Sequence, residues 1–358
     1  MSATLITDPG PGAFADRTVV MSGGSRGIGL AVAVALAERG ANVVLLAKTD
    51  DPDPRLPGTI HTAVAEIDAA AGRKGAAVGV VGDLRSDDNI ARLVSTAVER
   101  FGGIDVCVNN ASVLSTIPTA EITMNRYDLT QQVNTRGTFA LTKACLPHLE
   151  RAEEGRVVTL SPPLNLSPDW LGRYPAYMLG KYGMSLLTMG FAAEFADLGI
   201  AANCLWPETT IATAAVQNLL GGDEATAHAR SPQIMADAAM ALLDLPAAFR
   251  SDGPGGGIIQ DSASSSTLVA VPVFAFFSAG VAVGVVLNQP HQPSALHEGW
   301  RGGRIGRRER GRHVYALIAV LTCLCAVAAL LALQGKACAA LGVGPLVHAG
   351  GGVAAVAD

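Results

Sequence analysis

Tyr177 and Lys181 lie four residues apart in a segment with helical character, so both side chains project from one face of a helix. A tyrosine is a weak acid with an ordinary pKa of about 10, and a nearby ammonium stabilises its phenolate. The pair therefore predicts a group that donates or accepts a proton near neutral pH. Because the spacing is common by chance, the alternative interpretation is a packed tyrosine beside a solvated lysine.

A glycine-rich turn near the N-terminus predicts a site for an anion. Residues 19–29 are VVMSGGSRGIG, a short apolar strand followed by glycines that open a helix. Backbone N–H groups and the helix dipole favour a phosphate at such a turn. Gly23 and Gly27 allow the backbone to turn, and Gly29 allows helix and strand to pack closely. A surface loop is the alternative, but the strand at 41–47 completes a βαβ unit.

Strands and helices alternate along the first 260 residues. The pattern predicts strands at 19–22, 41–47, 76–81, 104–108, 156–160, 200–205 and 257–259, and helices at 30–39, 60–71, 86–101, 123–149 and 174–195. The strands are apolar on both faces, which is typical of buried parallel strands. We therefore predict an α/β fold with a doubly wound parallel, Rossmann-like sheet, and ligands at the carboxyl ends of its strands.

The motifs, taken in this order, resemble those of the short-chain dehydrogenase/reductase family over about residues 15–262. The matching positions are Gly23, Gly27 and Gly29; Asp83 with Leu84; Asn109-Asn110-Ala111-Ser112; Asn134; Tyr177 and Lys181; and Pro207 followed by Glu208, Thr209 and Thr210. The segments 47–49, 58–60, 161–166 and 205–207 are similar to the hydroxysteroid dehydrogenase-like branch, whose members are often linked to lipid metabolism.

The resemblance implies an enzyme that transfers a hydride between a nicotinamide cofactor and a carbonyl or alcohol. Tyr177 would transfer the proton, Lys181 would lower the tyrosine pKa and hold the ribose, and Asn134 would hold a water. The cofactor contacts that it implies are Gly23, Ser25, Arg26, Gly27, Ile28, Gly29, Lys48, Asp83, Leu84, Asn109, Ala111, Tyr177, Lys181, Pro207 and Thr209. No metal is expected.

One departure from the family pattern concerns the catalytic serine, which usually lies about a dozen residues before the tyrosine. Here Ser161 lies sixteen residues before Tyr177, and Pro162 occupies what is often the catalytic position. We expect Ser161 to polarise the carbonyl, and Ser167 is the other candidate. The alternative function is a catalytically weakened nucleotide-binding protein of the same fold.

The choice of cofactor depends on the residues that follow the second strand. Enzymes that use NAD usually carry an acidic residue there to bind the ribose hydroxyls. This chain has Lys48 instead, and Arg26 lies inside the glycine turn. Two cations favour the 2′-phosphate of NADP over NAD, unless both side chains are merely solvated.

Composition and charge indicate how the chain is divided and which partners are excluded. The 358 residues are 49% hydrophobic and 16% charged, with a net charge of −5 that argues against a nucleic-acid partner. We predict a flexible N-terminus over 1–14, an oxidoreductase domain over 15–262 and an apolar, arginine-rich tail over 263–358. The six cysteines lack metal-ligand spacing and predict buried free thiols in a reducing compartment. We expect a homo-oligomer, as is common in the family.

Two uncharged stretches in the tail, 267–287 and 314–333, are long enough to span a bilayer. Arginines are concentrated between them, and arginine-rich loops stay on the cytoplasmic side. A single span at 314–333 would therefore keep these arginines and the enzyme domain on the cytoplasmic face. The N-terminus does not have the pattern of a signal peptide. The alternatives are a soluble cytoplasmic protein and a tail that is poorly ordered or read out of frame.

Overall fold

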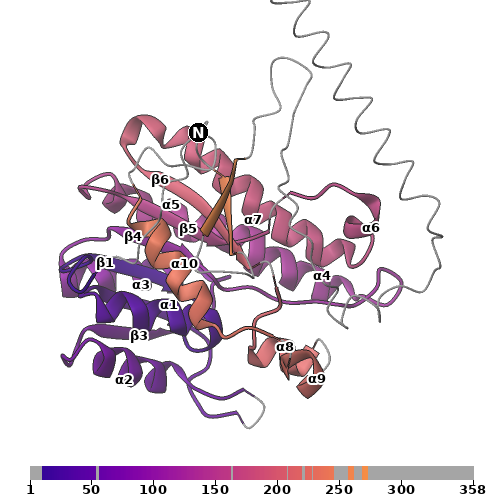
Figure 1. The fold of residues 1–358 in the computed structure, drawn as a ribbon, viewed down its shortest axis with the longest axis horizontal. Coiled ribbons are helices and arrows are strands. Elements are labelled where there is room, and N and C mark those ends of the chain that lie inside the picture. Colours follow the sequence, from indigo (N-terminus) through magenta and orange to yellow (C-terminus); the bar gives the residue numbers. More distant parts are fainter. Residues whose placement is uncertain are drawn as a thin grey trace, which may run out of the picture. The chain divides into compact units, whose positions relative to one another are not determined.

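The computed structural model describes residues 10–53, 56–162, 164–207, 209–219, 222–227, 229–245, 257–261 and 268–272. These residues form an α/β fold in which one sheet lies between two layers of helices (Figure 1). The strands are β1 (Thr18–Ser22), β2 (Asn42–Ala47), β3 (Ala77–Val81), β4 (Val106–Asn109), β5 (Arg156–Leu160), β6 (Ala201–Pro207), β7 (Gly257–Asp261) and β8 (Leu268–Pro272). Their order across the sheet is β3-β2-β1-β4-β5-β6-β7-β8.

The sheet is parallel from β3 to β7, and β8 pairs antiparallel with β7. The chain order reverses at β1, because Met21 pairs with Leu45 of β2 on one side and with Val108 of β4 on the other. The carboxyl ends of β1 and β4 therefore form the switch point where open α/β sheets bind ligands. The predicted doubly wound parallel sheet is confirmed.

Helices cover both faces of the sheet because each strand sends alternate side chains to opposite sides. Val19 and Met21 pack with α1 (Gly27–Glu38), α2 (Ile60–Ala70) and α10 (Gln233–Leu243). Val20, in contrast, packs with α3 (Asp87–Phe101), α5 (Gly137–Leu149) and α7 (Pro175–Glu194). The shorter helical segments are α4 (Met124–Gln131), α6 (Pro168–Leu171), η2 (Ala196–Leu198), α8 (Ala214–Leu219) and α9 (Gly222–Ala227).

The helix predicted over 123–149 has the expected extent, but a π turn, η1 (Gln132–Arg136), separates α4 from α5. Thr123 caps its start, because the Thr123 hydroxyl accepts a hydrogen bond from the Arg126 N–H at 3.3 Å. A π turn inserts an extra residue into a helix and often occurs at functional sites. Here it contains Asn134, whose side chain is fully buried.

The ends of the described chain differ from the prediction in two respects. Phe14 belongs to the segment predicted to be flexible, yet its ring is buried in the core and its N–H donates to the Arg39 carbonyl at 3.0 Å. Residues 268–272, past the predicted domain end at 262, form β8 within the candidate membrane stretch 267–287. The rest of that stretch and all of 314–333 lie outside the described residues.

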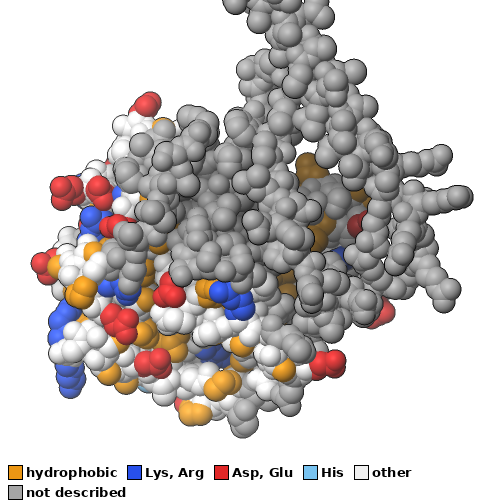
Figure 2. Space-filling view, in the orientation of Figure 1, with side chains coloured by type: hydrophobic (Ala, Val, Ile, Leu, Met, Phe, Trp, Pro, Cys, Tyr) orange, Lys and Arg blue, Asp and Glu red, His pale blue; other side chains and the backbone are white. Residues whose placement is uncertain are grey.

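Within the described part of the chain, no helix combines the length and the apolar character needed to cross a membrane. Cys107, Cys145 and Cys204 are buried free thiols, as predicted, and the other three cysteines lie outside the described residues. On the face shown in Figure 2, acidic and basic side chains are interspersed with hydrophobic ones.

Candidate active site

The glycine turn leaves β1 with the backbone geometry that its sequence predicts. Gly23 and Gly27 have φ angles of +76° and +57°, a region that favours glycine. The Asn110 side chain donates to the Gly23 carbonyl at 2.7 Å, and the Ala111 N–H donates to the Ser22 hydroxyl at 3.2 Å. The turn is thus fastened to the end of β4, and its position at the start of α1 suits an anion.

Gly29 has no space for a side chain. A Cβ added there would lie 2.5 Å from Asn110 Nδ2 and 2.6 Å from the Gly23 carbonyl oxygen. Ser25 is buried in the turn, and Ile28 packs against the core beneath α1. The predicted close packing is therefore present, and it keeps the backbone of the turn open to a ligand phosphate.

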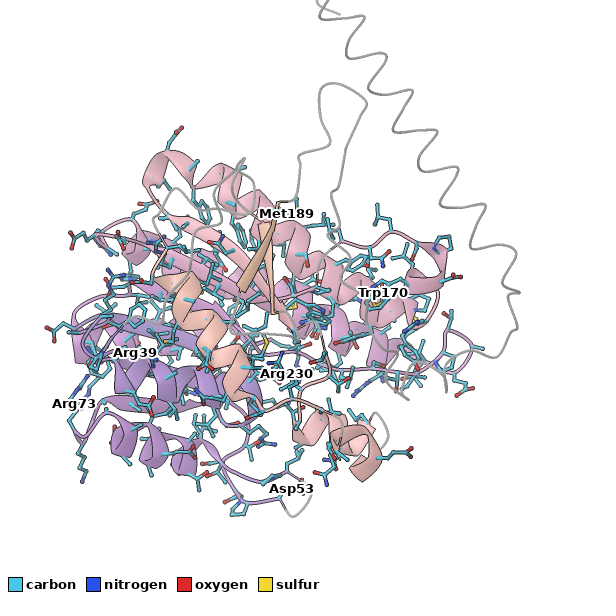
Figure 3. The ribbon with its side chains drawn as sticks, viewed as in Figure 1. Arg39, Asp53, Arg73, Trp170, Met189 and Arg230 are labelled. Atoms are coloured by element: carbon cyan, nitrogen blue, oxygen red, sulfur yellow. The ribbon has the colours of Figure 1, made fainter. Side chains whose placement is uncertain are left out.

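Arg26 lies between the glycine turn and the loop that follows β2. Its Nη2 donates to the Thr49 hydroxyl at 2.6 Å and to the Gly58 carbonyl at 3.0 Å. Its buried Nε has no hydrogen-bond partner among the described residues. Burial lowers the Arg26 pKa, and Asp53, labelled in Figure 3 in the same loop, opposes that change. A half-buried cation whose Nε donor is unused suits an additional anion.

Lys48 and Asp83 form an ion pair at the ends of β2 and β3, with 3.1 Å between Nζ and Oδ2. Arg85 donates to the same carboxylate oxygen at 2.6 Å. The hydrogen bond from Arg85, with a smaller contribution from Lys48, holds the pKa of Asp83 well below its usual range. Leu84 is buried, and its side chain fills the space that Gly137 leaves, since a Cβ there would lie 2.6 Å from it.

The side chain of Asn109 lies in the core at the end of β4. Its side-chain amide is buried and donates to the Thr142 hydroxyl at 3.0 Å and, at 3.4 Å, to the Thr159 hydroxyl. Asn109 therefore joins β4 to α5 and β5, whereas the neighbouring Asn110 holds the glycine turn. Asn110 is not among the predicted cofactor contacts, although it belongs to the matching motif.

Asn134 and Tyr177 approach the two residues that follow Ala111. Asn134 Oδ1 accepts from the Val113 N–H at 2.7 Å, and the Ser112 side chain acts to lower the pKa of Tyr177. Helix α7 packs against Asn134, because a Cβ on Gly180 would lie 3.2 Å from Asn134 Nδ2. Burial raises the pKa of Tyr177 to about 12, although Ser112 opposes that shift. The phenol is thus protonated at neutral pH.

The Lys181 side chain is buried and turned toward the sheet. Its Nζ donates to the Leu160 carbonyl at 2.5 Å, contacts Met184 Sδ at 3.5 Å and lies 5.8 Å from the centre of the Trp206 ring. Burial lowers the Lys181 pKa to about 8. Burial and Ser112 are the causes of the Tyr177 pKa shift, and Lys181 is not among them. The expected lowering of the tyrosine pKa is therefore absent from this arrangement, because the ammonium points at Leu160.

This buried lysine predicts a pH-dependent stability. Between pH 8 and 10.5 the folded protein binds fewer protons than the unfolded chain, so the free energy of unfolding rises with pH. The rise is at most about 3 kcal/mol, at 1.36 kcal/mol for each pKa unit. We expect Lys181→Met to remove it. Urea unfolding of both proteins at pH 7.5, 9 and 10.5 measures the effect, and equal slopes with pH would contradict it.

The loop after β5 carries both predicted serines, Ser161 and Ser167. Ser161 is fully buried, and its hydroxyl has no hydrogen-bond partner among the described residues. The Pro162 carbonyl accepts from the Ser185 hydroxyl at 2.6 Å, and the Tyr182 hydroxyl donates to the Asn165 carbonyl at 2.5 Å. The loop is thus held on α7 beyond Tyr177. Ser167 is exposed at the start of α6.

The chain that follows β6 returns over the glycine turn. β6 ends at Pro207, and the buried Thr209 hydroxyl has no hydrogen-bond partner in the described part of the chain. A Cβ on Gly27 would lie 3.3 Å from Thr213 Cγ2, so this segment covers the turn. Ile211 forms a bridge with Arg230, which Figure 3 labels. The Thr209 hydroxyl therefore retains unused hydrogen-bonding capacity among the described residues.

Known proteins resemble this chain in the same region. A family model described as short chain dehydrogenase matches residues 17–222. Hydroxysteroid dehydrogenase-like protein 2 of Danio rerio is 47% identical over 238 residues, 66% of this chain and 56% of that protein. The protein of the same name from Homo sapiens is 44% identical over 241 residues, 67% and 56% of the two chains. The chain thus matches little more than half the length of these relatives.

Two solved structures extend the comparison. A short chain dehydrogenase from Mycobacterium thermoresistibile is 50% identical, with a TM-score of 0.62, over 66% of this chain and 83% of that one. A metagenomic short-chain oxidoreductase in complex with NADP is 27% identical, with a TM-score of 0.52, over 64% of this chain and 90% of that one. The chain therefore belongs to the short-chain dehydrogenase/reductase family of oxidoreductases, in the hydroxysteroid dehydrogenase-like branch.

Proposed function

We propose that this protein is an NADP-dependent oxidoreductase that exchanges a hydride with a carbonyl or alcohol of lipid-like or steroid-like character. The observation that carries the proposal is that α7, the helix with the Tyr177 phenol, is connected to the glycine turn by packing and hydrogen bonds. Tyr177 lies on α7 three residues before Gly180, which packs against Asn134. Asn134 accepts from the Val113 N–H, and two residues earlier the Ala111 N–H donates to Ser22 at the start of that turn. A proton donor beside an anion site is what hydride transfer to a carbonyl requires.

The residues suit a nicotinamide dinucleotide. The open turn at Gly23, Gly27 and Gly29 would hold its diphosphate, and the buried Thr209 hydroxyl lacks a partner among the described residues. When bound, the cofactor supplies the hydride. The chain would supply the proton from Tyr177, which is a phenol at neutral pH, as a tyrosine of ordinary pKa also is. Asn134 holds the strand end that carries Ser112, through Val113.

NADP is favoured over NAD by the cations around the ends of β2 and β3. Arg26 has an unused buried donor, and Lys48 is 64% exposed beside an Asp83 that Arg85 also binds. Lys48 can therefore contact a 2′-phosphate without leaving the carboxylate unpaired. The name of the metagenomic neighbour, a complex with NADP, agrees with this choice.

We expect Lys48→Ala to weaken NADPH binding about tenfold, a loss of about 1.4 kcal/mol, and to leave NADH binding within twofold. The measurement is the dissociation constant of each cofactor from tryptophan fluorescence quenching. Lys74→Ala is the control, because Lys74 is an exposed lysine that precedes β3 at its amino end. Equal losses for NADPH and NADH would argue for NAD as the cofactor.

The test of the function is oxidation of NADPH, followed at 340 nm, with a panel of ketones and aldehydes that includes steroids and acyl-chain carbonyls. Turnover that Tyr177→Phe abolishes supports the proposal. The second candidate, a catalytically weakened nucleotide-binding protein, is motivated by the buried, partnerless Ser161 hydroxyl beside Pro162. Tight NADPH binding without turnover of any member of the panel would favour that candidate.

We also propose that the chain is a homo-oligomer through the exposed side of α5 and α7. Phe139, Leu179 and Leu186 are 46%, 55% and 57% exposed there. A groove of about 540 Å³ between these helices is lined by Phe139, Leu179 and Leu187, among others. We expect Phe139→Lys to shift the particle mass in light scattering toward the monomer. Leu198→Lys, at another exposed leucine, should leave it unchanged.

For the location of the protein we propose the cytoplasmic face of a membrane, with residues 314–333 as the anchor. The support is the sequence alone, an uncharged segment next to an arginine-rich one. The alternative is a soluble cytoplasmic protein. Sedimentation of membranes after carbonate washing would distinguish the two, since the full chain should pellet and a chain ending at residue 313 should not.

A further inference from the structure

The first turn of α7, which carries Tyr177, has no side-chain cap. Tyr174 precedes the helix, and its side chain makes no capping hydrogen bond to any described residue of that turn. Pro175, at the first position, suits a helix start but has no N–H with which to fasten it. Because the ends of helices fray, the position of the Tyr177 phenol depends on what else holds this turn.

Gln131, the last residue of α4, bonds the turn from the helix beside α7 (Figure 1). Its Nε2 donates to the Ala176 carbonyl at 2.7 Å, and Ala176 directly precedes Tyr177. A backbone carbonyl has two lone pairs, so that of Ala176 can accept this bond in addition to the one inside the helix. Gln131 thus supplies from outside the fixed contact that the missing cap does not give.

The same face of α7 lies unusually close to the segment that carries Gln131. A Cβ on Gly183 would lie 2.5 Å from Thr135 Oγ1 and 2.8 Å from Thr135 Cγ2, so only glycine fits there. The Thr135 hydroxyl donates to the Gly180 carbonyl at 3.2 Å. Ala176, Gly180 and Gly183 follow the i, i+4, i+7 spacing of one helix face. The bond from Gln131 is therefore one end of a contact that continues for two turns of α7.

Other side-chain bonds to the sheet fix α7 farther along its length. Lys181 Nζ donates to the Leu160 carbonyl at 2.5 Å, and the Ser185 hydroxyl donates to the Pro162 carbonyl at 2.6 Å. Both bonds come from residues at least one turn beyond Tyr177. They hold the body of the helix on β5 and its loop, whereas Gln131 bonds the backbone of the first turn itself.

We propose that Gln131 is a positioning residue, which holds the first turn of α7 so that the Tyr177 phenol is within reach of the substrate oxygen. This inference rests on the proposed function. Successive residues of a helix are rotated by about 100°, so Tyr177 projects from the face next to the one that Gln131 binds. A shift of the turn therefore moves the phenol directly, and a misplacement of about 1 Å can lower a rate by about 10²-fold.

The test replaces Gln131 with methionine, which keeps the length of the side chain and removes the donor. We expect kcat for carbonyl reduction to fall by about 10- to 10²-fold, with KM and the NADPH dissociation constant within threefold. Gln132→Met is the matched control, because Gln132 is exposed and lines the same groove of about 540 Å³ as Gln131. This control should keep the wild-type kcat.

A double-mutant cycle with Tyr177→Phe separates positioning from a general loss of stability. If Gln131 acts through the phenol, Gln131→Met should change the residual rate of Tyr177→Phe less than twofold. Hydrogen exchange over residues 174–180, measured without cofactor, gives a readout that does not depend on turnover. It should be at least about threefold faster in Gln131→Met than in the wild type or in Gln132→Met.

Wild-type kcat in Gln131→Met would overturn the inference, as would an equal loss of rate with and without the Tyr177 hydroxyl. Unchanged hydrogen exchange in Gln131→Met would also contradict it. A wild type that reduces no carbonyl, or a Tyr177→Phe variant with wild-type turnover, would instead overturn the proposed function. The exchange experiment would then decide by itself whether Gln131 holds the first turn of α7.

Discussion

Replacing Tyr177 with phenylalanine should lower kcat for carbonyl reduction by about 10²- to 10⁴-fold, the range that a positioned general acid contributes. The phenol is protonated at neutral pH, since the ordinary pKa of a tyrosine is about 10 and burial raises that of Tyr177 to about 12. Phenylalanine keeps the ring and its packing on α7 but has no proton to give. The NADPH dissociation constant should change less than threefold, which fluorescence quenching measures beside the 340 nm rate.

Tyr182→Phe is the matched control on the same helix. Its hydroxyl donates to the Asn165 carbonyl at 2.5 Å, so this variant loses a structural hydrogen bond and no proposed proton donor. We expect less than a tenfold change in kcat and a loss of stability of about 1 kcal/mol. Turnover in Tyr177→Phe close to that of the wild type would exclude the phenol as the acid and favour the nucleotide-binding alternative.

The sheet and the glycine turn were predictable because their signals are local. Apolar runs of strand length alternate with helical periods, and parallel strands buried on both faces need that composition. Gly23 and Gly27 likewise predict a turn, because glycine readily adopts the positive φ angles that these two positions have in the folded backbone. The strand order that brings β1 beside β4 then follows from the regular winding of such folds.

The details that decide the chemistry depend on contacts between distant residues. The sequence of 123–149 is helical throughout, and the π turn that buries Asn134 has no local signal that distinguishes it from an α turn. Lys181 was expected to face the phenol, but the Leu160 carbonyl at the end of β5 binds its ammonium. Arg26 similarly bonds Thr49, on another loop.

Dependence on the folded sheet also explains why the roles of Asn109 and Asn110, at the end of β4, were not predicted. In a pair of adjacent asparagines, alternation along a strand sends one side chain to each face. Asn109 therefore enters the core and Asn110 reaches the glycine turn. Which asparagine enters the core and which reaches the turn depends on the register of β4 against β1, in which Ser22 pairs with Asn109. That register is a property of the folded sheet, and the motif alone does not predict it.

Gly29→Ala should damage both folding and cofactor binding. The added methyl group would lie 2.5 Å from Asn110 Nδ2 and 2.6 Å from the Gly23 carbonyl oxygen. The second contact is with backbone, so the turn itself must move, at a cost of about 1–3 kcal/mol for such overpacking. A displaced turn no longer directs its N–H groups at a phosphate. We expect the NADPH dissociation constant to rise at least about tenfold, which corresponds to about 1.4 kcal/mol.

Gly190→Ala is the control for that substitution, because Gly190 is also helical and a Cβ there would meet nothing within 4 Å. It should stabilise the protein by about 0.5–1 kcal/mol, since alanine loses less backbone entropy than glycine in a helix. Urea unfolding measures the stability of the two variants, which should change in opposite directions. NADPH titration measures their affinity for the cofactor. Wild-type NADPH affinity in Gly29→Ala would show that the phosphate does not bind at this turn, and the cofactor site would have to be sought elsewhere on the sheet.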